Sequence, residues 1–132
     1  MIIITKFGDI GGYIVGISSI SIFKKNHKII PSISPKKSWE GTIGGLIFSI
    51  FAAYIINIYF PITKTNQTMF SVITGILFFT GGFCGDLTES VLKRAADIKD
   101  SGNILPGIGG ALDLIDSLIY NSPFFLLILY II

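Results

Sequence analysis

Apolar and polar positions occur along this chain in long blocks: four extended apolar segments are separated by three polar connections. Residues 43–60, 65–85 and 117–132 contain no charged side chain. A helix of about 20 apolar residues crosses the roughly 30 Å hydrocarbon core of a bilayer. Because lipid offers the backbone no hydrogen-bond partner, such segments must be helical. We therefore expect membrane segments at about 2–23, 42–60, 67–85 and 110–132.

This pattern predicts an all-α fold, a polytopic transmembrane helical bundle of about four segments with a further helix at the cytoplasmic interface. The composition agrees, since 51% of the 132 residues are hydrophobic and only 14% are charged, against about 25% charged in soluble domains. The single cysteine, Cys84, excludes an internal disulfide, and we expect it to pack as a small residue in its apolar segment. We interpret residues 1–132 as one membrane domain and expect no nucleic-acid partner.

The basic residues are distributed unevenly between the connections. Residues 24–41 hold five of the ten, while residues 61–66 hold only Lys64. The connection 86–109 adds Lys93, Arg94 and Lys99. Two crossings separate the two basic connections, so both lie on the same side of the membrane. The positive-inside rule places that side in the cytoplasm.

Residues 86–116 interleave acidic and basic side chains next to an apolar segment. A charge beside the bilayer core is costly, so an ordered set of charges indicates a functional site. Asp86, Ser90, Lys93 and Asp97 recur at intervals of four, three and four residues, which places them on one face of a helix. We expect this helix to end near residues 101–103 and a new one to begin near residue 111.

The carboxylates and cations of this region fit a metal-bound polyphosphate. Asp86, Asp113 and Asp116 would be ligands of Mg²⁺, which needs only one or two carboxylates besides substrate phosphates. Lys93 and Arg94 would hold the phosphates. Two alternatives stay open: the aspartates are solvated by headgroups or paired with these cations, and the cations serve only to set the topology.

A second dense motif precedes the second apolar segment, with the sequence SPKKSWEG at residues 34–41. Lys36 and Lys37 would bind a phosphate or, alternatively, attract anionic lipid as a basic juxtamembrane loop. Trp39 is expected to be an interfacial anchor. Asp9 either faces a polar cavity or lies outside the membrane. We expect His27, the only histidine, to be a solvated loop residue without a ligand role.

These motifs together resemble the signature of the phosphatidate cytidylyltransferase (CDP-diacylglycerol synthase) family. The resemblance rests on residues 90–94, on residues 34–41 as that family's second motif, and on a longer set of paired positions. That set consists of Lys99 and Asp100, Pro106 and Gly107, Gly109 and Gly110, and Asp113 and Asp116. It covers essentially the whole chain, but only the C-terminal, catalytic half of the usual family protein. We therefore expect a fragment, a split gene product or a reduced form.

The resemblance implies an enzyme that makes CDP-diacylglycerol and pyrophosphate from CTP and phosphatidic acid in a bacterial inner membrane, at its cytoplasmic face. It implies catalytic roles for Asp86, Lys93, Asp113 and Asp116, with the three aspartates binding Mg²⁺. The substrate-binding residues it implies are Lys36, Lys37, Ser90, Arg94, Lys99 and Asp100. The partners it implies are the lipid membrane and either a second copy of the chain or the missing N-terminal half.

Two positions depart from the commonest family signature. Ile108 stands where the family often has His, and Leu114 stands where it often has Arg. These departures and the missing half leave a non-catalytic or partner-dependent fragment as an alternative. A CDP-alcohol phosphotransferase is a further alternative, but Asp116 is followed by Ser117 rather than Gly, and no further aspartates follow.

Overall fold

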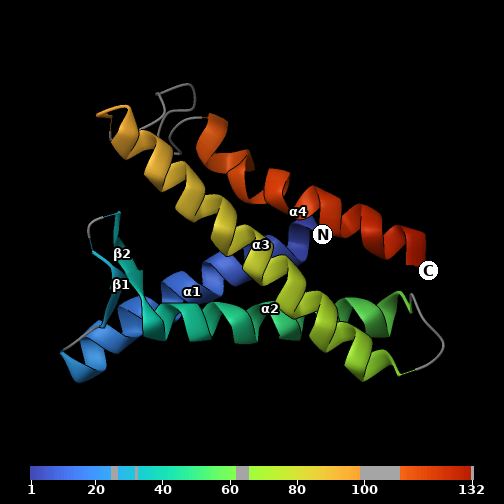
Figure 1. Cartoon of the computed structure of the whole chain (residues 1–132). Coiled ribbons are helices and arrows are strands. Elements are labelled where there is room, and N and C mark those ends of the chain that lie inside the picture. The colour runs from blue at the N-terminus through green and yellow to red at the C-terminus, as the bar shows by residue number, and fades with distance from the viewer. Residues whose placement is uncertain (25–26, 32, 62–65, 99–110, 132) are drawn as a thin grey trace.

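A computed structural model shows four helices and one β-hairpin among the residues it describes, which are 1–24, 27–31, 33–61, 66–98 and 111–131. The side chains of residues 23, 36, 111–114 and 131 are outside this description. The elements are α1 (Ile2–Phe23), β1 (Lys28–Ile30), β2 (Ser34–Ser38), α2 (Trp39–Tyr59), α3 (Gln67–Ala95) and α4 (Ala111–Ile131). Helix α1 packs on α2, α2 on α3 and α3 on α4 (Figure 1).

The helices bury small and polar residues and expose large apolar ones. Ser49, Ser71, Ser117 and Asn121 are fully buried, whereas every helix exposes several large apolar side chains. Burial of small residues at helix contacts is typical of membrane helices, where lipid is as apolar as a protein core. Helices α2 and α3 are long and apolar enough to cross a membrane. Helix α4 contains a shorter apolar stretch, Ile115–Tyr130. Four crossings stay a prediction.

Polar side chains satisfy the backbone where the helices meet or are interrupted. Asn57 of α2 donates hydrogen bonds to the Gln67 carbonyl (3.0 Å) and the Ser71 hydroxyl (3.1 Å) of α3. Pro123 lies inside α4 and has no N–H to donate to the Ile119 carbonyl. The Ser122 hydroxyl donates to that carbonyl instead, at 2.7 Å. Such substitutes are needed where no water can solvate the backbone.

Two sequence-based expectations about the secondary structure are wrong. The interfacial helix is not separate, because α3 continues without a break through Asp86 to Ala95. It ends before residues 101–103: Asp97 has φ 54°, a left-handed conformation that stops a helix. The basic connection after α1 is also not a plain loop, since β1 and β2 pair antiparallel, with Lys28 opposite Ser38. Cys84 is exposed rather than packed.

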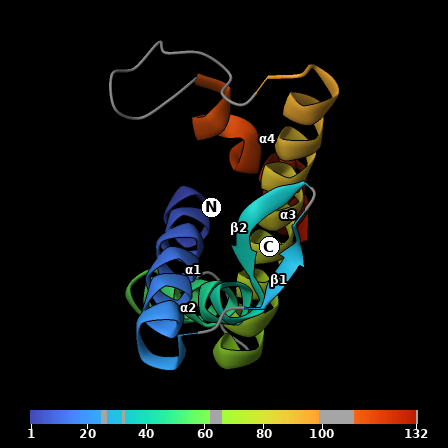
Figure 2. The same cartoon turned by 90° about the vertical axis from the view of Figure 1, so that its left-hand side faces the viewer.

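Glycines bring α1 and α2 into backbone contact along their length. A Cβ at Gly45 would lie 2.8 Å from the Gly8 carbonyl oxygen, and a Cβ at Gly41 would lie 2.8 Å from the Gly12 carbonyl oxygen. Gly44 and Gly45 therefore allow the two helices to pack closely. The two antiparallel helices form a rigid base, from whose end the hairpin rises toward α3 (Figure 2).

Replacing Gly45 with Ala should destabilise the protein although alanine is the better helix former. The added methyl would meet backbone of α1 and the Phe79 ring at 2.8 Å, and such overpacking costs about 1–3 kcal/mol. Gly16→Ala is the matched control, because its Cβ would find neighbours only at 3.6 Å or beyond. Thermal unfolding in detergent should show a lower Tm for Gly45→Ala alone. Equal Tm values for the two variants would contradict this packing.

Candidate active site

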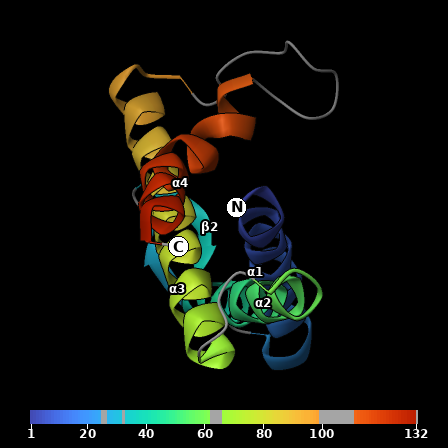
Figure 3. The ribbon, with the colours of Figure 1, turned by 90° about the vertical axis from the view of Figure 1, so that its right-hand side faces the viewer.

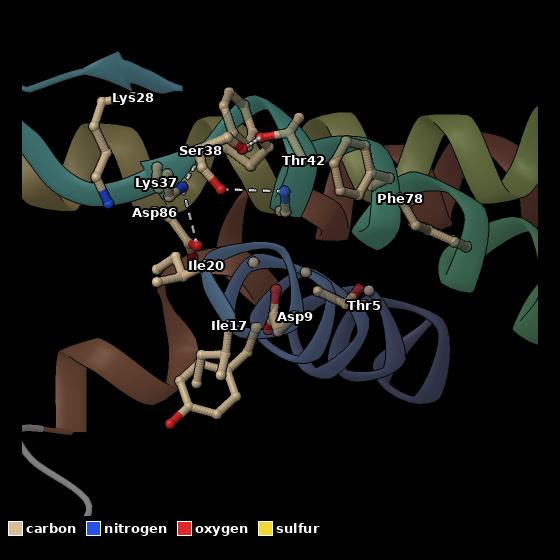
Figure 4. A pocket seen from close by; sticks show the side chains of 18 residues that line it. Thr5, Asp9, Ile17, Ile20, Lys28, Lys37, Ser38, Thr42, Phe78 and Asp86 are labelled. Atoms are coloured by element: carbon tan, nitrogen blue, oxygen red, sulfur yellow. Dashed lines mark hydrogen bonds and ion pairs between the residues drawn. The ribbon is translucent and has the colours of Figure 1, made fainter. Parts of the chain in front are cut away.

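The charged motifs meet at a cavity of about 480 Å³ between α1, β2, the start of α2 and α3. Asp9 enters it from α1, Lys28 and Lys37 from the two strands, and Asp86 from α3 (Figure 4). The expectation that Asp9 faces a polar cavity agrees with this geometry. Residues far apart in the sequence thus supply both signs of charge to one site.

An ion pair between Lys37 and Asp86 joins the two sequence motifs. The Lys37 ammonium lies 3.1 Å from the Asp86 carboxylate and donates to the Phe83 carbonyl at 3.4 Å. It also lies 4.3 Å from the centroid of the Phe83 ring, a cation–π geometry that favours a partly desolvated cation. The side chains of Lys37 and Asp86 are 20% and 35% exposed, so a substrate can still reach both.

Local sequence explains how the hairpin presents Lys37. Ser38 caps α2, its hydroxyl accepting a hydrogen bond from the Gly41 N–H at 3.2 Å, so β2 must end directly before the helix. Glu40 holds the base of the hairpin, since its carboxylate lies 2.8 Å from the His27 Nδ1 and accepts from the His27 N–H. The Trp39 N–H donates to the His27 carbonyl at 3.0 Å. Lys37 therefore projects from a backbone that is fixed at both ends.

Sequence reasoning missed this role of His27. It is exposed, with 78% of its side chain accessible, but it pairs with Glu40 rather than standing alone in the solvent. The hairpin brings the two residues together, and the sequence pattern did not predict this hairpin. His27 has a positioning contact here, and the expectation that it is no metal ligand is not tested.

The α3–α4 contact places Asp116 beside Asp86. A Cβ at Gly85 would lie 2.8 Å from the Asp116 carbonyl oxygen and 2.9 Å from the Ser117 Cα, so glycine is needed for this approach. Asp116 is 7% exposed, and Asp86 and Glu89 are neighbours of its carboxyl group. Carboxyl groups from two helices are therefore neighbours. Figure 3 shows the ribbons of α3 and α4, which pack on each other.

Asn121 fixes α4 against both α1 and α3. Its amide donates to the Thr5 hydroxyl at 2.8 Å and to the Phe78 carbonyl at 2.9 Å, and it is fully buried. One helical turn earlier, the Ser117 hydroxyl accepts from Lys6 at 3.3 Å, and Lys6 also lies 3.3 Å from Asp9. These contacts determine where the first two turns of α4, which carry the aspartates, stand relative to the cavity. An isolated Asn in an apolar segment was the only sequence signal for this contact.

Other predicted site residues lie further along α3 and do not line the cavity. Ser90 and Lys93 are half-buried, and Arg94 is exposed in the last turn. Lys93 lies 2.9 Å from Glu89, four residues earlier on the same helix, and forms an ion pair with it. Lys99, Asp100 and Ile108 lie outside the described residues. So do the side chains of Lys36, Asp113 and Leu114.

The described part of the chain contains no group of three Asp, Glu, His or Cys side chains that could hold a metal ion by itself. The donor types nevertheless suit Mg²⁺. Asp86 and Asp116 make side-chain contact, and adjacent carboxylates are disfavoured unless a cation or a proton lies between them. Two carboxylates with substrate phosphates and waters make a sufficient magnesium site. Asp113 begins the same helix as Asp116, but its side chain is outside the description.

The fold and the site define a helical protein with two helices suited to crossing a membrane and a cavity that acidic and basic side chains line together. The chain matches the cytidylyltransferase family over residues 1–132 and belongs to that family. The resemblance inferred from the motifs is thereby confirmed.

Curated relatives carry the corresponding name. The chain is 42% identical over 122 residues to a phosphatidate cytidylyltransferase of Mycobacterium tuberculosis (strain H37Rv), covering 92% of this chain and 35% of the relative. It is 41% identical over 126 residues to that of Bacillus subtilis (strain 168), covering 92% and 44%. An uncharacterized Escherichia coli (strain K12) protein, YnbB, is 40% identical over 125 residues, covering 95% and 39%. The chain thus spans less than half the length of each of these relatives.

Proposed function

We propose that this chain forms the C-terminal, catalytic part of a nucleotidyltransferase that makes CDP-diacylglycerol and pyrophosphate from CTP and phosphatidic acid. The observation that carries the proposal is the Lys37–Asp86 ion pair at 3.1 Å, which joins the SPKKSWEG motif to the charged segment that begins at Asp86. Relatives at 41–42% identity are named phosphatidate cytidylyltransferase. This name supports the reaction, and the ion pair supports its location at this cavity.

The proposed chemistry is a single in-line displacement. An oxygen of the lipid phosphate attacks the α-phosphorus of CTP, a new P–O bond forms, and the bond to the β-phosphate oxygen breaks to release pyrophosphate. No covalent enzyme intermediate is needed, so catalysis consists of positioning and charge stabilisation. Mg²⁺ held by Asp86, Asp116 and Asp113 would supply neutralisation of the phosphate charge.

The protein's own residues align the reacting groups in this scheme. Lys37 and, by resemblance, Lys36 hold a phosphate at the cavity. From Asp86, helix α3 continues to Ser90, Lys93 and Arg94. In this scheme the polyphosphate of CTP lies along these residues. At about 1.5 Å of rise per residue, Ser90 and Lys93 stand roughly 6 and 10 Å along the helix from Asp86, a span that suits three linked phosphates. Lys99 and Asp100 are assigned to the nucleotide side by resemblance.

We propose that the site operates at the cytoplasmic face of a bacterial inner membrane. A soluble nucleotide and a lipid headgroup can meet only at an interface, and the basic connections place this interface in the cytoplasm. Because the chain spans 35–44% of the two named relatives, the active protein is proposed to include the family's N-terminal part or a second copy of this chain.

The test is CTP-dependent synthesis of CDP-diacylglycerol in membranes that contain this chain. The chain is assayed alone and together with the N-terminal part of the Bacillus subtilis relative, with labelled CTP, phosphatidic acid and Mg²⁺. We expect labelled lipid and an equal amount of pyrophosphate in at least one preparation. Absence of labelled lipid from both would contradict the proposal and favour a non-catalytic remnant. Consumption of CDP-diacylglycerol with an added alcohol would instead indicate a phosphotransferase.

A further inference from the structure

Lys6 and Asp9 are the only charged residues in the sequence of α1. An ionisable side chain in an apolar helix is costly and indicates a functional contact. The Lys6 ammonium lies 3.3 Å from the Asp9 carboxylate, and the two side chains are 36% and 39% exposed. Ion pairs that are exposed to this extent add little to stability. The pair with Asp9 therefore does not by itself explain a lysine at this position.

The second contact of Lys6 lies outside α1. Its ammonium donates to the Ser117 hydroxyl of α4 at 3.3 Å, across 111 positions of the sequence. Ser117 is fully buried, and a hydroxyl that is removed from water needs a hydrogen-bond partner. Asp9 holds the lysine on α1 and Ser117 joins it to α4, so Lys6 forms a bridge between the two helices.

This bridge lies beside the junction of α1, α3 and α4. A Cβ at Gly82 of α3 would lie 3.2 Å from the Thr5 Cγ2 and 3.7 Å from the Ser117 Cβ, so the three helices converge there. Thr5 and Gly82 line the cavity, whereas Lys6 and Ser117 do not. Lys6 is therefore next to the candidate site but behind its wall, where it can act on the site only through another residue.

Ser117 connects the bridge to a carboxylate of the site. The Ser117 N–H donates to the Asp116 carboxylate at 2.5 Å, and Asp86 is a neighbour of that carboxyl group. Because Ser117 follows Asp116 in the same helical turn, a movement of Ser117 also moves Asp116 relative to Asp86. Lys6 thus restrains the position of one carboxyl group relative to the other.

Two further contacts hold α4, but they leave this restraint to Lys6. Gly85 allows a close approach of α4 to α3 and does not involve α1. Asn121 bonds to α1 and α3, but it does so one helical turn after Ser117. A helix that is fixed at one level can still tilt about that level. The hydrogen bond from Lys6 prevents such a tilt at the beginning of α4.

The positive charge of Lys6 also suits this position. Asp86 is an acidic neighbour of both Asp9 and Asp116, and neighbouring carboxylates repel one another unless a cation lies near them. Lys6 pairs with Asp9 directly and is joined to the helix of Asp116 through Ser117. A neutral side chain would remove both the balancing charge and the bridge.

We propose that Lys6 is a positioning residue for the reaction. It holds the beginning of α4 against α1 through Ser117, and it thereby keeps Asp116 beside Asp86. Lys6 touches neither substrate. The catalytic part of this assignment rests on the proposed function, whereas the bridge itself does not.

The kinetic test replaces Lys6 with Met, which has a similar length but no ammonium. In the preparation that makes CDP-diacylglycerol, kcat should fall about tenfold, because a small displacement of a catalytic group lowers the rate. The KM values for CTP and phosphatidic acid should stay within about twofold of the parent values. Lys6→Arg should keep at least about half of the parent kcat, since the guanidinium can donate to both partners.

Lys24→Met is the matched control for the loss of one positive charge. Lys24 is exposed at the other end of α1, so this variant should keep the parent kcat. A parent-like kcat in Lys6→Met, or a raised KM with an unchanged kcat, would overturn the assignment.

A double-mutant cycle tests whether Lys6 acts through Ser117. Ser117→Ala removes only the hydroxyl and should lower kcat by a similar factor. The double variant Lys6→Met with Ser117→Ala should be no slower than the slower single variant, because both changes break the same bridge. If the two effects multiply instead, the residues act separately and the proposal is wrong.

A distance measurement between α1 and α4 requires no turnover. Nitroxide labels are attached after Ile3→Cys and Ile119→Cys, at positions that are 57% and 54% exposed on the two helices. Cys84→Val removes the native thiol, and dilution with unlabelled chain restricts the measurement to labels within one molecule. Electron paramagnetic resonance then gives the distribution of distances between the labels.

We expect this distribution to broaden in Lys6→Met and in Ser117→Ala, and to match the parent in Lys6→Arg and Lys24→Met. A parent-like distribution in Lys6→Met would overturn the bridge even where CDP-diacylglycerol is made. A broadened distribution in a chain that makes no CDP-diacylglycerol in any preparation would uphold the bridge and contradict only the proposed activity.

Discussion

Asp86→Asn should abolish CDP-diacylglycerol synthesis, with a decrease in kcat/KM of at least about 10²–10³-fold. The Asp86 carboxylate is where β2, α3 and α4 meet, since it pairs with Lys37 at 3.1 Å and contacts the side chain of Asp116. Asparagine has nearly the same shape but carries no charge. It can neither hold a divalent cation as strongly nor keep Lys37 in place.

The stability of Asp86→Asn should be almost that of the parent protein. The pair with Lys37 is partly exposed, and such pairs contribute only about 0–1 kcal/mol to folding. Asp97→Asn is the matched control, because Asp97 follows the end of α3 and is exposed. Assays of synthesis over a range of Mg²⁺ concentrations should separate the two variants. Parent-like activity and Mg²⁺ dependence in Asp86→Asn would remove this residue from the site.

Gly85→Val should cause a loss of activity of similar size through displacement of α4. The new Cβ would lie 2.8 Å from the Asp116 carbonyl oxygen and 2.9 Å from the Ser117 Cα. The Asp116 oxygen and the Ser117 Cα are backbone atoms that cannot rotate away, so the beginning of α4 must move. A shift of about 1 Å at a catalytic group can cost about 10²-fold in rate, and the overpacking itself costs about 1–3 kcal/mol.

Cys84→Val provides the control for this helix position. Cys84 precedes Gly85 and is exposed, so valine there adds a similar side chain without a contact to α4. Activity and Tm should both fall in Gly85→Val and stay near the parent values in Cys84→Val. A Gly85→Val protein that keeps full activity would show that the close approach of α4 to Asp86 is not needed for the reaction.

The positions of the helices could be predicted from the sequence because the apolar segments are long and contain few charged residues. The expected segments 2–23 and 67–85 begin at the same residues as α1 and α3. The extension of α3 to Ala95 was missed as a continuous helix, since the change from apolar to charged residues at Asp86 was interpreted as a membrane boundary. Helical hydrogen bonds depend on the backbone, so a change of side-chain polarity need not interrupt them.

The hairpin could not be predicted because its strands are short and stabilised by distant contacts. Its five-residue strand β2 contains Pro35 and two lysines, a composition typical of a loop. The pairing of His27 with Glu40 and of Lys37 with Asp86 holds it in place. Such contacts join residues from different elements, and no local pattern encodes them.

The sequence by itself determined the helical class, the family and the set of charged residues that carry the proposed chemistry, because apolar block length and motif spacing are local properties. Only the tertiary structure decided which of these charges meet. It brought Lys37 to Asp86 and Asp116 to the same carboxylate, and it placed Ser90, Lys93 and Arg94 away from the cavity. The physical reason is that glycine contacts of α1 with α2 and of α3 with α4 set the distances between these helices. Each distance depends on the residues of both helices together, so the pattern of one helix alone does not give it.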